Sequence, residues 1–115
     1  MVFETVQKHS DVTLYRTGLL YISRHAVAKY FCASPFALVE YDPDTMTVAL
    51  TPTNGKPSKH TWTLMETTRG TRTVSLKAVL KRYHVSLCQS IFADLEERDG
   101  RLCFQIPREA VKSGS

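Results

Sequence analysis

An internal repeat constrains the fold of this 115-residue chain more than any other feature of its sequence. Residues 18–31 align without gaps with residues 70–83, at a constant offset of 52 positions. A glycine opens both segments, and the apolar positions of one segment largely match those of the other. The identical pairs are Gly18/Gly70, Ser23/Ser75, Ala26/Ala78, Val27/Val79 and Lys29/Lys81. Such a repeat predicts two similar structural units that cover each other's exposed apolar faces and strand edges.

Hydrophobic periodicity predicts one order of elements in both units: strand, glycine turn, strand, short helix, strand, turn, strand. A serine precedes each helix, and the hydroxyls of Ser23 and Ser75 are expected to cap the first helical turns. Asp42-Pro-Asp-Thr45 and Asp99-Gly100 predict turns between the last two strands of each unit. The predicted strands are 12–15, 19–22, 36–41, 46–50, 60–66, 71–74, 91–95 and 102–106, and the predicted helices are 24–32 and 77–83.

The length of the chain predicts a single domain over residues 1–115, with internal repeats at approximately 12–52 and 60–107. The expected fold class is mainly β (α+β). The expected architecture is a small pseudo-twofold barrel of two strand–strand–helix–strand–strand units. Two units that close a barrel leave no unpaired strand edge, and this is the physical reason for the prediction.

A family resemblance follows from the order of residues within the two units. In both, a glycine, a short β run ending in Ile or Val, a serine, a short helix and an acidic strand–turn–strand follow one another. This pattern resembles the SpoVT/AbrB swapped-hairpin domain, with one unit at Gly18 to Pro52 and another at Gly70 to Pro107. That family usually builds its barrel from two identical chains, so the resemblance implies two fused halves in a monomeric pseudo-dimer or a homodimer. The order of elements is also similar to the double-psi barrel, and both the swapped-hairpin and the double-psi type are open on this pattern.

The resemblance implies a non-enzymatic, transcription-regulator-like protein that binds double-stranded DNA. Such regulators present basic side chains from the strand after the glycine and from the short helix. The sequence departs from the family directly after the glycines, where an arginine is common and this chain has Leu19 and Thr71. The expected DNA contacts are Arg72, Lys77, Lys81 and Arg82, with Arg24 and Lys29 secondary and Arg16 and Arg69 flanking the glycines.

The charge distribution is uneven, and the basic residues gather in the second half of the chain. Residues 56–115 carry eleven Lys and Arg against six Asp and Glu, whereas residues 1–55 carry four against five. Between residues 56 and 82 the single acidic residue is Glu66. A basic stretch of this kind attracts phosphate, or it merely solvates one face of the protein. Charge alone does not decide between these two interpretations.

Other functional classes have less support in the sequence. The alternative to DNA binding is a protein–protein interaction module of unknown role, phage- or plasmid-associated, without nucleic acid. An enzyme built on a double-psi barrel comes third. Tyr15, Tyr21, Tyr30, Phe31 and Trp62 could stack on unpaired bases, but their spacing favours a place in the core.

No catalytic residue, cofactor or metal site is predicted. The four histidines and three cysteines do not have metal-ligand spacing, and the five glycines are scattered rather than gathered in a phosphate-binding loop. The cysteines are expected as free thiols in the core, which favours a cytoplasmic location. No apolar run approaches the ~18 residues of a membrane span, and the first residues do not resemble a signal peptide.

Overall fold

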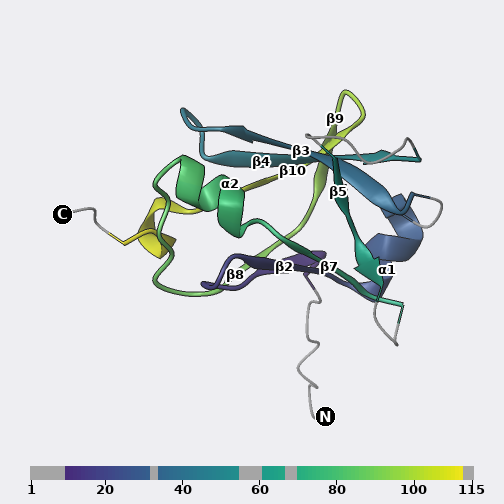
Figure 1. The fold of residues 1–115 in the computed structure, drawn as a ribbon, viewed down its shortest axis with the longest axis horizontal. Helices are drawn as coiled ribbons and strands as arrows, with labels where there is room; N and C mark the ends of the chain where they lie inside the picture. Colours follow the sequence, from purple (N-terminus) through teal and green to yellow (C-terminus); the bar gives the residue numbers. More distant parts are fainter. Residues whose placement is uncertain (1–9, 32–33, 55–60, 67–69, 113–115) are drawn as a thin grey trace, which may run out of the picture.

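Two five-stranded antiparallel sheets form the body of the computed structural model (Figure 1), which describes residues 10–31, 34–54, 61–66 and 70–112. Sheet A has the order β6-β7-β2-β1-β8, and sheet B has the order β5-β3-β4-β10-β9. The strands of sheet A are β1 (Val12–Leu14), β2 (Leu19–Ile22), β6 (Met65–Glu66), β7 (Arg72–Ser75) and β8 (Ile91–Ala93). The strands of sheet B are β3 (Phe36–Asp42), β4 (Thr47–Thr53), β5 (Thr61–Thr63), β9 (Glu96–Arg98) and β10 (Arg101–Gln105). The mainly β prediction is therefore confirmed.

One helical segment joins sheet A to sheet B, and a second lies between two strands of sheet A. The first unit has α1 (Arg24–Ala26), continued by the π-helical turn η1 (Val27–Phe31), and the second unit has α2 (Lys77–Arg82). A 3-10 turn, η2 (Arg108–Ala110), follows the last strand. In Figure 1, α1 and α2 lie toward opposite ends of the long axis. No helix of the described residues is long and apolar enough to cross a membrane.

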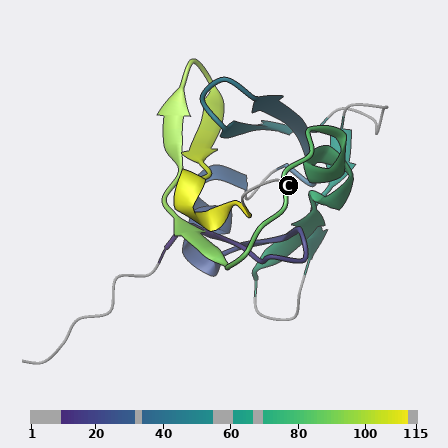
Figure 2. The same ribbon diagram turned by 90° about the vertical axis from the view of Figure 1, so that its left-hand side faces the viewer.

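Two segments of the chain belong to both sheets. β5 pairs with β3 in sheet B, and after the buried Leu64 the chain continues as β6, which pairs with β7 in sheet A. In the same way β8 pairs with β1 in sheet A, and past the buried Leu95 the chain continues as β9 against β10 in sheet B. Figure 2 shows the two sheets facing each other. Among the described residues the ladders form two separate sheets and no closed barrel is seen, so the barrel type stays a prediction.

The core lies between the facing sheets and follows the alternation of the strands. In β2, Leu20 and Ile22 are fully buried, whereas Leu19 and Tyr21 point to the outer face, because successive side chains of a strand lie on opposite sides of its sheet. Phe31 closes the core at the end of η1 and is also fully buried. The other large side chains with almost no exposure are Leu14, Leu50, Leu76, Ile106, Val12 and Val48.

Among the described residues, four ladders join the two units, β2–β7, β4–β10, β1–β8 and β3–β5, and in the first two of them equivalent strands pair with each other. The ladder between β2 and β7 places Tyr21 opposite Thr73, and these two residues are equivalent at the offset of 52. The ladder between β4 and β10 places Ala49 opposite Cys103, which correspond after a two-residue slip of the alignment. Equivalent residues meet face to face where a twofold axis passes between two strands. Both ladders therefore have the pairing that a twofold relation between the units would produce.

The paired glycines have a backbone conformation that favours glycine. Gly18 has φ +96° and Gly70 has φ +76°. A Cβ at Gly18 would lie 2.9 Å from the Cα of Lys77, and one at Gly70 would lie 3.5 Å from the Cγ of Arg24. Lys77 and Arg24 are the first residues of α2 and α1, so the glycine turn of each unit lies against the start of the other unit's helix.

The two predicted serine caps have different outcomes in the structure. Ser23 caps α1 as expected, its hydroxyl accepting from the N–H of Ala26 at 3.2 Å. Ser75, in contrast, still pairs with Leu19 in the sheet, and the next N–H, of Leu76, donates to the carbonyl of Gly18. The continued strand pairing delays the helix by one residue, so Leu76 rather than Ser75 occupies the N-cap position, although the Ser75 hydroxyl still accepts from the N–H of Lys77 at 3.4 Å.

Three further expectations differ from the structure. The predicted strand 60–66 is broken into β5 and β6, which lie in different sheets, and β4 runs on to Thr53, past the predicted end at residue 50. Of the cysteines, Cys103 is buried but Cys88 is exposed, its thiol 3.5 Å from the carbonyl of Glu109. Cys32 lies outside the described residues.

Candidate nucleic-acid interface

A hollow of about 340 Å³ lies beside α2 and gathers basic side chains from three parts of the chain. Arg16 comes from the turn between β1 and β2, Lys77 and Lys81 come from α2, and Lys112 comes from the C-terminal segment. The described residues that line the hollow include no acidic side chain. The remaining lining residues are Thr17, Gly18, Leu80, Val85, Ser86 and Leu87.

Backbone contacts hold the elements of this hollow in place. The Tyr15 N–H donates to Leu19 and the Gly18 N–H donates to Tyr15, which fixes the turn that bears Arg16. Lys77 and Lys81 are four residues apart, so they project from the same face of α2. The Lys112 N–H donates to the carbonyl of Ser86 at 2.7 Å, which ties the C-terminal segment to the loop after α2. The hollow is therefore built from tertiary contacts and not from one continuous basic segment.

The electrostatics of the hollow favour an anion. All four basic side chains belong to exposed residues, and like charges that share one concave surface raise its positive potential. The hydroxyls of Thr17 and Ser86 add hydrogen-bond donors in the same place. Several cationic side chains beside hydroxyl donors are the groups that hold phosphate oxygens at protein–DNA interfaces.

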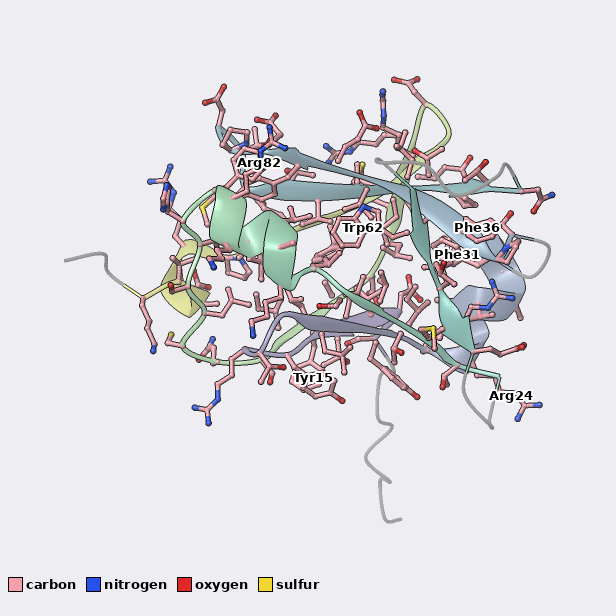
Figure 3. The ribbon with its side chains drawn as sticks, in the orientation of Figure 1. Tyr15, Arg24, Phe31, Phe36, Trp62 and Arg82 are labelled. Carbon is pink, nitrogen blue, oxygen red and sulfur yellow. The ribbon has the colours of Figure 1, made fainter. Side chains whose placement is uncertain are left out.

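The structure places the exposed predicted DNA contacts in three different locations. Lys77 and Lys81 line the basic hollow, and Arg82 is exposed on another side of α2. Arg24 and Lys29 are exposed on α1 and η1, and Figure 3 shows Arg24 at the opposite end of the molecule from Arg82. The Lys29 ammonium lies 5.0 Å from the centroid of the Tyr30 ring, and a hydrogen bond with Tyr30 raises the pKa of Lys29. Arg69 lies outside the described residues.

Arg72, expected as a leading DNA contact, is inside the protein. It is 9% exposed, and its Nη1 donates to the carbonyls of Phe31 at 3.0 Å and Ser34 at 2.6 Å. On β7 it shares a face with the buried Val74, since the two are two residues apart in a strand. The expectation that Arg72 lies on the exposed basic face is therefore wrong. Its guanidinium instead donates hydrogen bonds to backbone carbonyls at the end of η1 and just after it.

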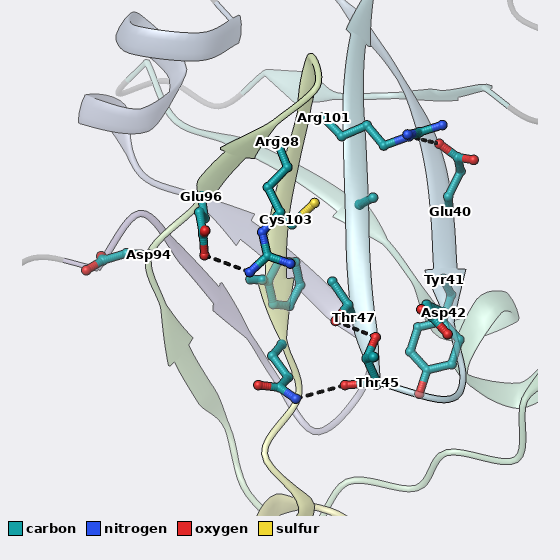
Figure 4. Close-up of a pocket in the computed structure, with 13 residues that line it drawn as sticks. Glu40, Tyr41, Asp42, Thr45, Thr47, Asp94, Glu96, Arg98, Arg101 and Cys103 are labelled. Atoms are coloured by element: carbon teal, nitrogen blue, oxygen red, sulfur yellow. Dashed lines mark hydrogen bonds and ion pairs between the residues drawn. The ribbon is translucent and has the colours of Figure 1, made fainter.

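A second and larger hollow lies on the outer face of sheet B (Figure 4). It measures about 650 Å³, and Ala49 and Cys103 are adjacent on its floor. Glu40 and Glu96 lie on the flanking strands and each binds an arginine: Arg101 Nε is 2.9 Å from Glu40, and Arg98 Nη2 is 3.0 Å from Glu96. The hydrogen bond from Arg98 lowers the pKa of Glu96. Because its arginines are bound to carboxylates, this hollow is a poorer phosphate site than the one beside α2.

Neither a metal site nor a similarity to known proteins indicates a function for this chain. Among the described residues, no group of three or more His, Cys, Asp or Glu side chains could hold a metal ion. No protein-family model, no curated protein and no solved structure matches this chain. Inference about function therefore depends on the geometry of the surface.

Sequence reasoning misses part of the candidate interface. It predicts Arg16 only as a flank of Gly18, and it gives Lys112 no role. Lys112 follows 31 positions after Lys81, and no local pattern of the sequence brings the two together. Only the contacts between residues 86–88 and 110–112 place Lys112 beside α2.

Proposed function

We propose that this chain is a non-enzymatic, transcription-regulator-like protein that binds double-stranded DNA through the basic hollow beside α2. One observation carries the proposal: Arg16, Lys77, Lys81 and Lys112 converge from three segments on one concave surface, with no acidic side chain among its described lining residues. Lys77 and Lys81 would hold neighbouring phosphates, with Arg16 and Lys112 on either side. Arg82 would extend this surface along α2, and Arg24 and Lys29 would make a secondary contact at the other end.

A salt titration of duplex binding tests this proposal. Removal of one lysine that neutralises a phosphate should reduce the slope of log K against log salt by about 0.9, so the double variant Lys77→Ala/Lys81→Ala should reduce it by roughly 1.8. Fluorescence anisotropy of a labelled duplex over a range of salt concentrations measures both slope and affinity. The melting temperature should hardly change, because substitutions of exposed residues usually alter stability by no more than about 0.5 kcal/mol.

The double variant Arg98→Ala/Arg101→Ala is the matched control. It also removes two positive charges, but from arginines that are bound to Glu96 and Glu40 on sheet B. Its salt slope should stay at the wild-type value. An equal reduction of the slope in the two double variants would show that only net charge matters and would contradict an interface at α2. Absence of salt-dependent binding by the wild type would reject the proposal as a whole.

One further surface favours the alternative function, a protein-interaction module without nucleic acid. The outer face of sheet A carries a row of side chains across all five strands, in the register Met65–Thr73–Tyr21–Thr13–Phe92. Met65 and Phe92 at its ends are 62% and 70% exposed, and Leu19 and Tyr15 are exposed on the same sheet. Exposed apolar side chains gathered on one face are typical of a surface that meets another protein. This function replaces DNA binding if the salt titration fails.

We also propose that the two units are fused halves of a pseudo-twofold barrel of the swapped-hairpin or double-psi type. The segments shared between the sheets and the contact of each glycine turn with the other unit's helix support this. Both halves then lie in one chain, so dilute protein should sediment as a folded monomer, or as a dimer that dissociates without unfolding. Loss of the β-sheet circular dichroism signal on dilution would mean that a second chain is needed.

A further inference from the structure

An aromatic cavity of about 340 Å³ lies on the other flank of α2. Three rings line it: Tyr41 from β3, Trp62 from β5 and Tyr83 directly after α2. The Tyr41 and Tyr83 rings have centroids 4.8 Å apart and are tilted by 50°. Arg82, Val79, Val39 and Glu40 complete the lining. Figure 3 shows Trp62 beside α2, with Arg82 toward the other end of that helix.

Two of the rings are fixed in place and the third is accessible. Tyr41 and Trp62 pack against the hydrophobic core, so their orientation is set before any ligand arrives. Tyr83 is 39% exposed and lies at the end of α2, where it can pack on an incoming ring. Any nucleobase can stack on the face of such an aromatic ring, because every base has a flat π face. The cavity also falls in the size range of small-molecule sites, ~300–1,000 Å³.

The arginine in the lining of the cavity disfavours a cationic ligand. The Glu40 carboxylate is bound to Arg101, and Arg101 lines the hollow on the outer face of sheet B rather than this cavity. The described lining of the cavity has two charged side chains, Glu40 and Arg82. Glu40 is paired with Arg101, whereas no carboxylate of the described residues forms an ion pair with Arg82. A positive group beside the rings repels ammonium ligands, which otherwise favour aromatic cages.

Apart from the Glu40 carboxylate, which is bound to Arg101, the polar side chains of the cavity can donate hydrogen bonds. Burial raises the pKa of Tyr41, with Asp42 and Tyr83 adding to the shift, so its phenol keeps its proton. Tyr83 supplies a second phenol and Arg82 a planar guanidinium. Nucleobases have a flat π face, and their carbonyl oxygens and ring nitrogens accept hydrogen bonds at the edge. This combination matches both the rings and the donors of the cavity.

We propose that this cavity binds an unpaired nucleobase, supplied by a free nucleotide or by a single strand. Lys81 lines the basic hollow on one flank of α2 and Arg82 lines the aromatic cavity on the other. A base stacked on the accessible face of the rings would therefore have its phosphate close to Arg82. The inference goes beyond duplex binding, because paired bases cannot enter the cavity, and it does not depend on the basic hollow.

Trp62 provides a direct measurement, because it is the single tryptophan of the chain and lines the cavity. Its fluorescence should be quenched in a saturable way by adenosine or guanosine 5′-monophosphate, and not by ribose 5-phosphate. Tyr83→Ala should weaken nucleotide binding by about tenfold or more, as expected for removal of one stacking partner. Tyr15→Ala is the matched control, because Tyr15 is 41% exposed but lies on sheet A; it should bind as the wild type does.

Further measurements distinguish a free nucleotide from a single strand, and failure of the nucleobase site from failure of duplex binding. Tighter binding of a single-stranded oligonucleotide than of a mononucleotide would identify a strand as the source, and the reverse a free nucleotide. Lys77→Ala/Lys81→Ala should retain mononucleotide quenching even where duplex binding is abolished, so the two proposals can fail separately. Equal quenching by ribose 5-phosphate, quenching by tetramethylammonium, no quenching at all, or wild-type affinity in Tyr83→Ala would each overturn the nucleobase site.

Discussion

Replacement of Gly18 by alanine is expected to lower the free energy of unfolding by about 3 kcal/mol, because two costs add at this position. The first is conformational, since Gly18 has φ +96°, where a side chain is strained. The second is steric, since the new Cβ would lie 2.9 Å from the Cα of Lys77. The neighbour is backbone at the start of α2, so the clash is relieved only if the helix moves away from the turn. Urea unfolding followed by circular dichroism measures the decrease.

Gly100 provides the control for the conformational cost alone. It has φ +80° in the turn between β9 and β10, and nothing lies within 4 Å of a Cβ built on it. Gly100→Ala should therefore cost only about 1–2 kcal/mol. A similar decrease in both variants would mean that the Gly18 turn and α2 separate without penalty. It would also argue against a tight contact between the glycine turn of one unit and the helix of the other.

Local sequence chemistry predicts much of this fold. The glycines at 18 and 70 mark turns because their backbones adopt positive φ, and Asp99-Gly100 marks a hairpin turn for the same reason. Alternation of apolar residues places β1, β2, β3, β4 and β10 correctly to within a few residues. These elements depend on neighbours in the chain, and a pattern of neighbouring residues therefore contains the information that specifies them.

Long-range pairing explains the failures. The segment 60–66 has the pattern of one strand, but its two halves pair with β3 and β7, which lie in different sheets. Ser75 has the right residue type for an N-cap, yet pairing with Leu19 keeps it in the strand. The basic hollow depends on Lys112, which the C-terminal segment brings to α2. None of these partners can be identified from the residues beside them.

Arg72 is a different case, because the strand period could have placed it. It precedes the apolar Val74 by two residues on β7, so it faces the core with Val74, whereas the composition of the segment suggests an exposed basic face. Period-two alternation predicts the direction of a side chain better than charge does, even for arginine. A buried guanidinium persists here because the carbonyls of Phe31 and Ser34 accept its hydrogen bonds.

Substitution of Arg72 by methionine should consequently cost about 2–4 kcal/mol of stability, since it removes two charge-assisted hydrogen bonds and takes this donor from the Ser34 carbonyl, whereas the Phe31 carbonyl keeps the N–H of Ser34. Relief of the desolvated charge offsets part of that cost. Arg72→Lys should fall between methionine and wild type, because an ammonium keeps the charge but ends a shorter side chain than the one that brings Nη1, the donor of both bonds, to the two carbonyls. Arg82→Met, an exposed control on α2, should change stability by no more than about 0.5 kcal/mol.

The same variants separate a structural role for Arg72 from a role in DNA binding. Arg72 donates to the end of η1 from inside the protein, so folded Arg72→Met should bind a duplex with the wild-type affinity and salt slope. Measurements well below the unfolding midpoint keep the protein folded, and near-ultraviolet circular dichroism checks this. A reduced salt slope in Arg72→Met with little change in stability would instead show that the guanidinium reaches phosphate. That result would restore Arg72 as a leading contact and move the interface from the basic hollow to β7.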